Sequence, residues 1–215
     1  MDLSEKTART ARKLIGRYDE WRDGAVDRKY GLDTCGTQDA AAAARIAAQC
    51  HGYHYEPIQL AVFGRIMQAL PADPAELTFI DLGSGKGRAL VLAALRGFRR
   101  VIGIEYDADL HSAAQRNVER FRSTTGHLNP IELHCADAVR YELPGEDSLC
   151  FFYNSFDEVA LPRMLARIGE SLLEQPRRFF AAYRNPRHGR LLSDATFLRC
   201  LTRNSSFELY EGCGR

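Results

Sequence analysis

Lysine and long apolar runs are both scarce in this sequence. Of its 29 basic residues only four are lysine (Lys6, Lys13, Lys29 and Lys86), and 28 acidic residues leave a formal net charge of +1. Such a balance lacks the overall basic field on which non-specific nucleic-acid binders depend, so any nucleic-acid contact would be local. No run approaches the roughly 18 consecutive apolar residues that a membrane-spanning helix needs. The first thirty positions are charged and do not read as a secretion signal, so we expect a cytoplasmic protein with no membrane partner.

Paired cysteines are also missing. The six cysteines include no CxxC pair and no histidine at zinc-finger spacing, which argues against a zinc finger and gives no indication of any other metal site. We expect reduced thiols. Cys135 and Cys150 lie inside apolar runs, where a thiol behaves as a small hydrophobe, so the sequence predicts that both are buried.

Length and composition favour one core. With 215 residues, of which 45% are hydrophobic, the chain can build one sizeable core but is short for two domains. It contains no internal repeat and no low-complexity stretch. We therefore expect a single compact unit.

From Thr78 onward, short β-rich runs alternate with longer helical stretches, a pattern typical of a parallel sheet with crossover helices. The expected strands are Thr78–Leu82, Val101–Glu105, Ile131–Cys135, Leu149–Tyr153 and Phe179–Tyr183, with a weaker one at Phe207–Tyr210. The expected helices are Arg88–Leu95, Asp109–Phe121 and Asp157–Leu173. This order predicts an α/β fold with a doubly wound, mostly parallel sheet.

The residues before the first strand differ in character. Residues 1–22 and Ala40–Gln49 are candidate helices, and a third helix is indicated by Leu60, Phe63, Ile66, Met67 and Leu70. These segments are too small to bury a core alone. We therefore expect an N-terminal helical extension over residues 1–74, joined to a core over residues 75–215.

The most informative segment runs from Phe79 to Arg88, where a strand passes into three alternate glycines and then a helix. Glycines at these positions allow a sharp turn and a close approach of a ligand to the backbone. A phosphate-binding loop is excluded, because Ile80 takes its first glycine position and Gly87 replaces its serine or threonine. The dinucleotide-binding pattern needs glycine or alanine at position 88, where this chain has Arg88.

Three acids follow three successive strands. Asp81 precedes the glycines, which argues against an anionic pyrophosphate and for a cationic ligand such as S-adenosylmethionine, with its ammonium and sulfonium groups. Glu105 ends the next strand, where a carboxylate can accept hydrogen bonds from ribose hydroxyls. Asp137 follows the third strand and is placed to meet an adenine amino group. Simpler alternatives remain: a tight turn for the glycines, a surface acid for Glu105 and a turn cap for Asp137.

Residues 55–186 resemble the class I, seven-strand S-adenosylmethionine-dependent methyltransferases. The first motif of that family, D/E-x-G-x-G-x-G, is present from Asp81 to Gly87. The resemblance implies S-adenosyl-L-methionine as cofactor, a Rossmann-like fold and a methyltransferase activity (EC 2.1.1.-). It implies a cofactor site built from Tyr55, Glu56, Asp81, Gly83, Ser84, Gly85, Gly87, Glu105, Tyr106, Asp137, Ala138 and Asn154.

The fourth family motif corresponds to Asn154-Ser155-Phe156, a reduced form of the Asn-Pro-Pro-Tyr/Phe of enzymes that methylate amines. It also resembles the Asn-Asn-Phe of the seven-strand histone-lysine methyltransferases. In those families Tyr55-Glu56-Pro57 corresponds to a motif beside the methionine end of the cofactor, and Pro57 would open the third helix. The resemblance implies catalytic roles for Asn154, Phe156 and Tyr55. Alternatively, Asn154 only terminates a strand and Phe156 packs in the core.

Arginines gather late in the chain. Between Gln175 and Ser193 there is no acid, and Arg184 and Arg187 should lie at the cofactor edge, where they could receive an acidic substrate or RNA phosphate. Solvated loop charge is the simpler interpretation. Only 25 residues follow Arg190, so we expect a shortened sheet with Phe207–Tyr210 as an edge strand.

Together these observations predict a methyltransferase that acts on a nitrogen of a protein or small molecule. The alternatives are an O- or RNA-methyltransferase of the same fold and an inactive, methyltransferase-like binding or scaffold protein. An NAD-dependent oxidoreductase is disfavoured by Arg88. Neither the identity of the methyl acceptor nor the oligomeric state follows from the sequence.

Overall fold

The structure, a computed structural model, describes residues 23–36 and 55–213. The helices predicted over residues 1–22 and Ala40–Gln49 lie outside the described residues. None of the helices within the described part of the chain combines the length and the apolar character needed to cross a membrane.

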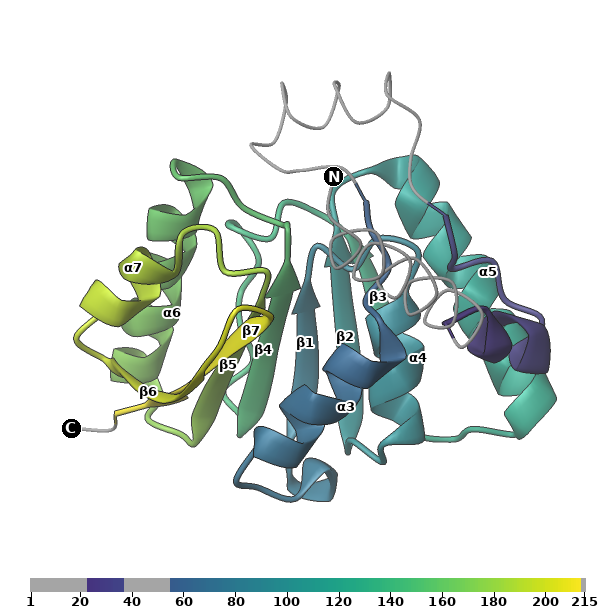
Figure 1. The fold of residues 1–215 in the computed structure, drawn as a ribbon, viewed down its shortest axis with the longest axis horizontal. Helices are drawn as coiled ribbons and strands as arrows, with labels where there is room; N and C mark the ends of the chain where they lie inside the picture. Colours follow the sequence, from purple (N-terminus) through teal and green to yellow (C-terminus); the bar gives the residue numbers. More distant parts are fainter. Residues whose placement is uncertain (1–22, 37–54, 214–215) are drawn as a thin grey trace, which may run out of the picture.

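A seven-stranded sheet forms the centre of the molecule, in the order β3-β2-β1-β4-β5-β7-β6 (Figure 1). The strands are β1 (Thr78–Leu82), β2 (Arg100–Glu105), β3 (Ile131–Cys135), β4 (Ser148–Tyr153), β5 (Phe179–Arg184), β6 (Leu198–Arg203) and β7 (Phe207–Gly212). The pairs among β1 to β5 are parallel, whereas β7 runs antiparallel to both of its neighbours. The predicted doubly wound, mostly parallel α/β fold is confirmed.

The prediction for the carboxyl-terminal end was wrong. The sheet is not shortened: β7 lies inside it, between β5 and β6, and β6 is the edge strand. The sequence of β6, Leu-Arg-Cys-Leu-Thr-Arg, has a single buried residue, Leu198, and lacks the apolar run by which the other strands were found. An edge strand needs apolar side chains only where it meets the core, so the hydrophobic pattern in its sequence is weak.

Helices cover both faces of the sheet (Figure 1). They are α3 (Leu60–Ala69), α4 (Arg88–Leu95), α5 (Ala108–Thr125), α6 (Ala160–Glu174) and α7 (Gly189–Asp194), with a short 3-10 turn at Pro74–Glu76. Helices α3, α4 and α5 share one buried cluster, and α6 and α7 share the other. Alternate residues of each central strand enter opposite clusters, as Phe79 and Ile80 do in β1, because successive side chains of a strand point to opposite faces.

The two cysteines predicted to be buried behave differently. Cys150 lies fully inside the core, as predicted, but Cys135 is exposed. Cys135 is the last residue of β3, an edge strand, and none of the strands in the described residues covers its outer side. The prediction of a buried Cys135 was therefore wrong.

Candidate functional site

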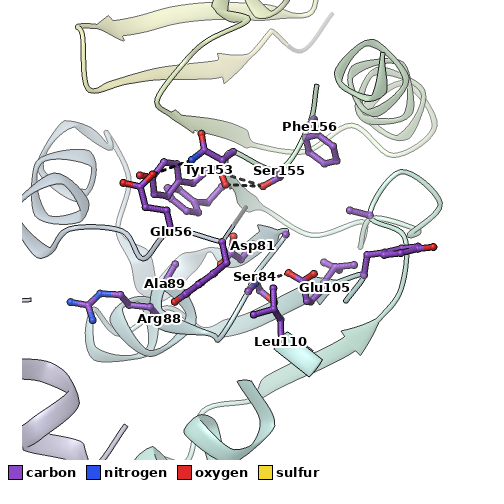
Figure 2. A pocket seen from close by; sticks show the side chains of 18 of the residues that line it. Glu56, Asp81, Ser84, Arg88, Ala89, Glu105, Leu110, Tyr153, Ser155 and Phe156 are labelled. Carbon is purple, nitrogen blue, oxygen red and sulfur yellow. Dashed lines mark hydrogen bonds between the residues drawn. The ribbon is translucent and has the colours of Figure 1, made fainter. Parts of the chain in front are cut away.

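A cavity opens at the carboxyl ends of β1, β2 and β4, where open α/β sheets bind ligands. Together with the solvent at its mouth it encloses about 860 Å³. Its wall contains all but one of the residues predicted for the site: Tyr55, Glu56, Asp81, Gly83, Ser84, Gly85, Glu105, Tyr106, Asp137, Ala138, Asn154 and Phe156. Figure 2 shows Glu56 and Tyr153 at one end, Ser84 and Glu105 at the other, and Asp81 between them.

The glycine loop is held by the neighbouring strand. The backbone N–H groups of Gly83 and Ser84 both donate to the carbonyl of Ile104, at 2.8 and 2.9 Å. Gly83 and Gly85 have φ angles of 91° and 54°, in the left-handed region that favours glycine. A Cβ at Gly85 would lie 2.2 Å from the Tyr55 ring. The loop therefore needs glycine both for its conformation and for close packing.

The predicted residue that does not line the cavity is Gly87. It has a φ of 83° and forms the N-cap of α4. A Cβ there would lie 3.3 Å from the Ala114 Cβ of α5. Gly87 therefore sets where α4 begins and how closely α4 packs on α5, and it does not line the cavity.

Replacing Gly85 with alanine should cost more stability than replacing Gly97. Both glycines have positive φ, so alanine at either costs about 1 to 2 kcal/mol of backbone energy. At Gly97 a Cβ meets nothing within 4 Å, whereas at Gly85 it would displace the Tyr55 ring. The free energies of unfolding of Gly85→Ala and Gly97→Ala, measured by chemical denaturation, would show the difference. Equal losses would contradict the packing of Tyr55 on the loop.

Asp81 is the most deeply placed acid of the site. Its side chain is only 3% exposed, and no other described residue makes a hydrogen bond to its carboxylate. Burial, with a further contribution from the charge of Glu105, raises the pKa of Asp81 well above its ordinary value. A buried carboxylate with no cationic partner among the described residues is costly, and this one faces the cavity. The site is therefore suited to a cationic ligand.

Glu105 connects the end of β2 to the glycine loop. Its Oε2 accepts the Gly85 N–H at 2.7 Å, and its Oε1 accepts the Asp107 N–H at 2.9 Å. Burial raises the pKa of Glu105, and these backbone hydrogen bonds act in the opposite direction. Each carboxylate oxygen retains a second lone pair for a ligand hydroxyl.

Two residues near Glu105 also line that end of the cavity. Tyr106 is 46% exposed, and Asp137 is part of the turn after β3. Asp137 Oδ1 accepts the Val139 N–H at 2.9 Å, and its Oδ2 lies 3.6 Å from Arg140 Nε. Asp137 therefore caps its turn and also lines the cavity, so the two interpretations of this residue are compatible.

At the opposite end, Asn154 lies between two polar side chains. Its Nδ2 donates to Glu56 Oε2 at 3.3 Å, and its Oδ1 accepts from Asn185 Nδ2 at 2.9 Å. A carboxylate only accepts hydrogen bonds, so Glu56 requires the amide NH₂ of Asn154 to face it. The side-chain carbonyl of Asn154 consequently faces Asn185. Both asparagines directly follow neighbouring strands, β4 and β5, and have left-handed φ angles of 54° and 55°.

Phe156 and Ser155 combine packing with site formation. The Phe156 ring is 6% exposed and packs edge-on against Phe152, with ring centroids 6.1 Å apart. Ser155 faces the glycine loop, because a Cβ on Gly83 would lie 2.6 Å from Ser155 Oγ. The core interpretation of Phe156 thus describes most of its ring, although the residue also lines the cavity.

Several lining residues were not predicted from the sequence. They are Pro57, Ile58, Arg88, Ala89, Ile104, Leu110, Ala136, Val139, Phe151, Tyr153 and Ser155. Seven of them directly precede or follow a predicted residue, so the positions next to each motif were the available signal. Arg88 directly follows Gly87, and Tyr153 directly precedes Asn154. Burial, together with the neighbouring Glu56 carboxylate, raises the pKa of the Tyr153 hydroxyl.

Arg184 lies at the carboxyl end of β5, at the predicted edge of the sheet, but its side chain is bound within the protein. Its Nη1 donates to the Ser206 carbonyl at 2.7 Å and its Nη2 to Gln59 Oε1 at 3.2 Å. The guanidinium also lies 5.1 Å from the centre of the Tyr153 ring. These contacts connect β5 to the region just before α3.

The prediction that Pro57 opens the third helix was wrong. Helix α3 begins at Leu60, after Gln59, whose side chain makes no capping bond. Instead Asp23 Oδ1 accepts the Leu60 N–H at 2.8 Å. A cap supplied from 37 residues away cannot be recognised from local sequence. Within the described residues, no cluster of three or more His, Cys, Asp or Glu side chains is arranged to hold a metal ion.

No protein-family model and no curated protein matches this chain. Solved structures do share its fold. One is a protein from Escherichia coli provisionally named methyltransferase yhhF, with 13% identity, a TM-score of 0.55 and coverage of 74% of this chain and 88% of that one. A provisionally named methyltransferase from Pseudomonas syringae has 14% identity and a TM-score of 0.53, and the match covers 71% of this chain and 96% of that one.

A third structure is geranyl diphosphate C-methyltransferase from Streptomyces coelicolor, crystallised with Mg²⁺, geranyl diphosphate and S-adenosyl-L-homocysteine. It has 16% identity, a TM-score of 0.51 and coverage of 72% of this chain and 79% of that one. Together with the strand order, these likenesses identify the fold as that of the class I methyltransferases.

Proposed function

We propose that this protein is an S-adenosyl-L-methionine-dependent methyltransferase whose acceptor atom is a nitrogen of a protein or small molecule. The observation that carries the proposal is the buried Asp81 carboxylate, which faces the cavity without a hydrogen bond from any other described residue. An ammonium or sulfonium ligand would supply the missing positive charge.

The residues present fit this cofactor. The glycine loop leaves the space that a Cβ would fill and lets a ligand approach the backbone. Glu105 has lone pairs available for two ribose hydroxyls beyond the N–H groups it accepts. Asp137 and the exposed Tyr106 ring lie beyond Glu105, where an adenine would extend. When bound, the cofactor supplies a methyl group on a positively charged sulfur.

The chain itself must orient the acceptor and exclude water, because methyl transfer is an in-line displacement. Tyr55, Phe151 and Tyr153 provide aromatic walls in the part of the cavity that extends from Asp81 to Glu56. Glu56 lies there too, and its carboxylate can accept more than the one hydrogen bond from Asn154.

This arrangement suits an acceptor that donates a hydrogen bond, as the N–H groups of an amine do. The Asn154 carbonyl is occupied by Asn185, so Glu56 is the group placed to accept a hydrogen bond from the acceptor. Asn154, Phe156 and Tyr55 keep their proposed catalytic roles, with Asn154 acting through the orientation of Glu56. The likeness to histone-lysine methyltransferases stays a prediction.

We also propose that residues 1–74 are an N-terminal extension to a core over residues 75–215. In support, α3 buries Phe63 and Ile66 in the same cluster as β1 and α4. The described part of the extension thus packs on the core and has no separate core of its own.

Calorimetric titration of the purified protein tests the cofactor assignment. We expect micromolar binding of S-adenosylmethionine and of its product S-adenosylhomocysteine, and no binding of NAD, because Arg88 replaces the small residue that the dinucleotide pattern needs. Release of S-adenosylhomocysteine with panels of amines, hydroxyl compounds and RNA then identifies the acceptor class. Absence of binding by a folded protein would contradict the proposal and favour the scaffold alternative.

A further inference from the structure

Arg88 is an unusual residue for the first turn of a helix beside a cofactor site. It is among the largest fully buried side chains, with only 2% of its surface exposed. Its guanidinium points away from Asp81 and Glu105, out of the cavity (Figure 2). Burying a guanidinium is costly unless its charge is paired and its donors are satisfied. The partners of Arg88 therefore indicate its structural role.

All of those partners lie in the chain before β1. Arg88 Nε donates to the Ile58 carbonyl at 2.8 Å, Nη1 to Thr34 Oγ1 at 2.9 Å and Nη2 to the Asp23 carbonyl at 2.7 Å. Asp23 and Asp27 also form ion pairs with the guanidinium at 3.5 Å. Two acids thus compensate the charge, and one side chain of α4 holds both residues 23–36, here called the N-terminal segment, and the region before α3.

The N-terminal segment in turn holds a wall of the cavity. Asp27 accepts the Thr34 hydroxyl at 2.6 Å and the backbone N–H groups of Thr34 and Cys35 at 2.8 Å. The Thr34 carbonyl then accepts the Tyr55 hydroxyl at 2.7 Å. The Tyr55 ring packs directly on Gly85. The contacts form a closed circuit from Arg88 through Thr34 and Tyr55 back to the glycine loop.

We propose that Arg88 is a positioning residue that couples the N-terminal segment to the cofactor-binding loop, holding Tyr55 over Gly85 through Thr34. Arg88 does not touch the cofactor in this scheme. A ligand seated on the glycine loop and the N-terminal segment then stabilise one another reciprocally. The inference rests on the proposed function for the identity of the ligand, but the link between Arg88 and the segment can be tested without it.

The experiment compares wild type with Arg88→Ala, with Arg120→Ala as the matched control. Arg120 also binds the N-terminal segment, donating to the Gly31 carbonyl at 3.2 Å, but it is exposed and makes no contact with Thr34. In the free protein, Arg88→Ala should speed amide hydrogen exchange in residues 23–36 and 83–87, whereas Arg120→Ala should leave residues 83–87 unchanged. In wild type, S-adenosylhomocysteine should slow exchange in both regions.

Affinity for S-adenosylhomocysteine, measured by calorimetry, should fall about tenfold in Arg88→Ala, within the usual range of coupling between sites. Millimolar guanidinium should restore part of it by filling the vacated position, which a merely destabilised fold would not permit. Tyr55→Phe keeps the ring but loses the bond to Thr34, so it should show the same exchange change on a smaller scale. This variant decides the matter if Arg88→Ala does not fold.

Two results would overturn the coupling. One is unchanged hydrogen exchange at residues 83–87 in both Arg88→Ala and Tyr55→Phe. The other is unchanged S-adenosylhomocysteine affinity in Arg88→Ala, with faster exchange confined to residues 23–36. Failure of the proposed function is a different outcome, because wild type itself would then not bind S-adenosylhomocysteine. In that case the exchange of residues 83–87 in the free variants decides the coupling.

Discussion

Asp81→Asn should reduce the affinity for S-adenosylmethionine by about 10- to 100-fold, the range expected when a hydrogen bond to a charged group is lost. Asparagine keeps the size of the side chain but removes the buried negative charge that a cationic ligand needs. Calorimetric titration measures the loss. Wild-type affinity in Asp81→Asn would contradict the cationic-ligand assignment and, with it, the argument that carries the proposed function.

The same substitution should not destabilise the free protein. The pKa of Asp81 is raised in the folded state, so its ionisation favours unfolding as the pH rises above the ordinary aspartate range. Asparagine removes that cost, and the free energy of unfolding of Asp81→Asn at neutral pH should equal or exceed that of wild type. A loss of binding with a gain in stability is the pattern expected of a group retained for function.

The pH dependence of binding follows from the same carboxylate. A cation selects the ionised form of Asp81, so affinity should rise with pH and level off once Asp81 is ionised in the free protein. Binding on the acidic side should release a proton, detected as a dependence of the calorimetric heat on the ionisation enthalpy of the buffer. Asp81→Asn should reduce this release, leaving only the contribution of Glu105, whose pKa is also raised.

Asn154→Gly should lower the rate of methyl transfer by about 100-fold, the order of loss expected when reacting groups are misplaced by about 1 Å. Glycine tolerates the left-handed backbone at this position, so the change removes the amide without adding strain. Without the bond from Asn154, the Glu56 carboxylate is no longer oriented toward the acceptor. Turnover is measured with whichever acceptor wild type methylates.

Binding and a matched variant provide the controls. S-adenosylhomocysteine affinity should stay close to that of wild type in Asn154→Gly, because Glu105 and Asp81 are unchanged. Asn185→Gly has the same backbone conformation and removes only the partner of the Asn154 carbonyl, so its rate should fall less. Normal turnover by Asn154→Gly would rule out the role of this asparagine.

The central sheet could be predicted from the sequence because its strands carry strong local patterns. Thr78–Leu82 and Ile131–Cys135 were predicted with their observed bounds, since each is a short run with alternating or continuous apolar residues that is followed by a turn. β6 was missed and β7 misplaced, because an edge strand has few buried positions and antiparallel insertion depends on long-range pairing. Local patterns do not determine which strands become neighbours.

The sequence by itself determined the pattern of the glycine loop, in which an acid at the end of a buried strand is followed by three alternate glycines. The glycines restrict the backbone conformation of the loop, and the acid before them restricts the charge of a ligand. Parallel strands also bring their carboxyl ends to one edge of the sheet. Only the tertiary structure decided the partners of these groups: that Asn154 turns its carbonyl to Asn185, that Asp23 caps α3, and that Arg88 is buried beneath the N-terminal segment. Each of these contacts joins residues at least 31 positions apart, so they form only when the packed core brings distant parts of the chain together.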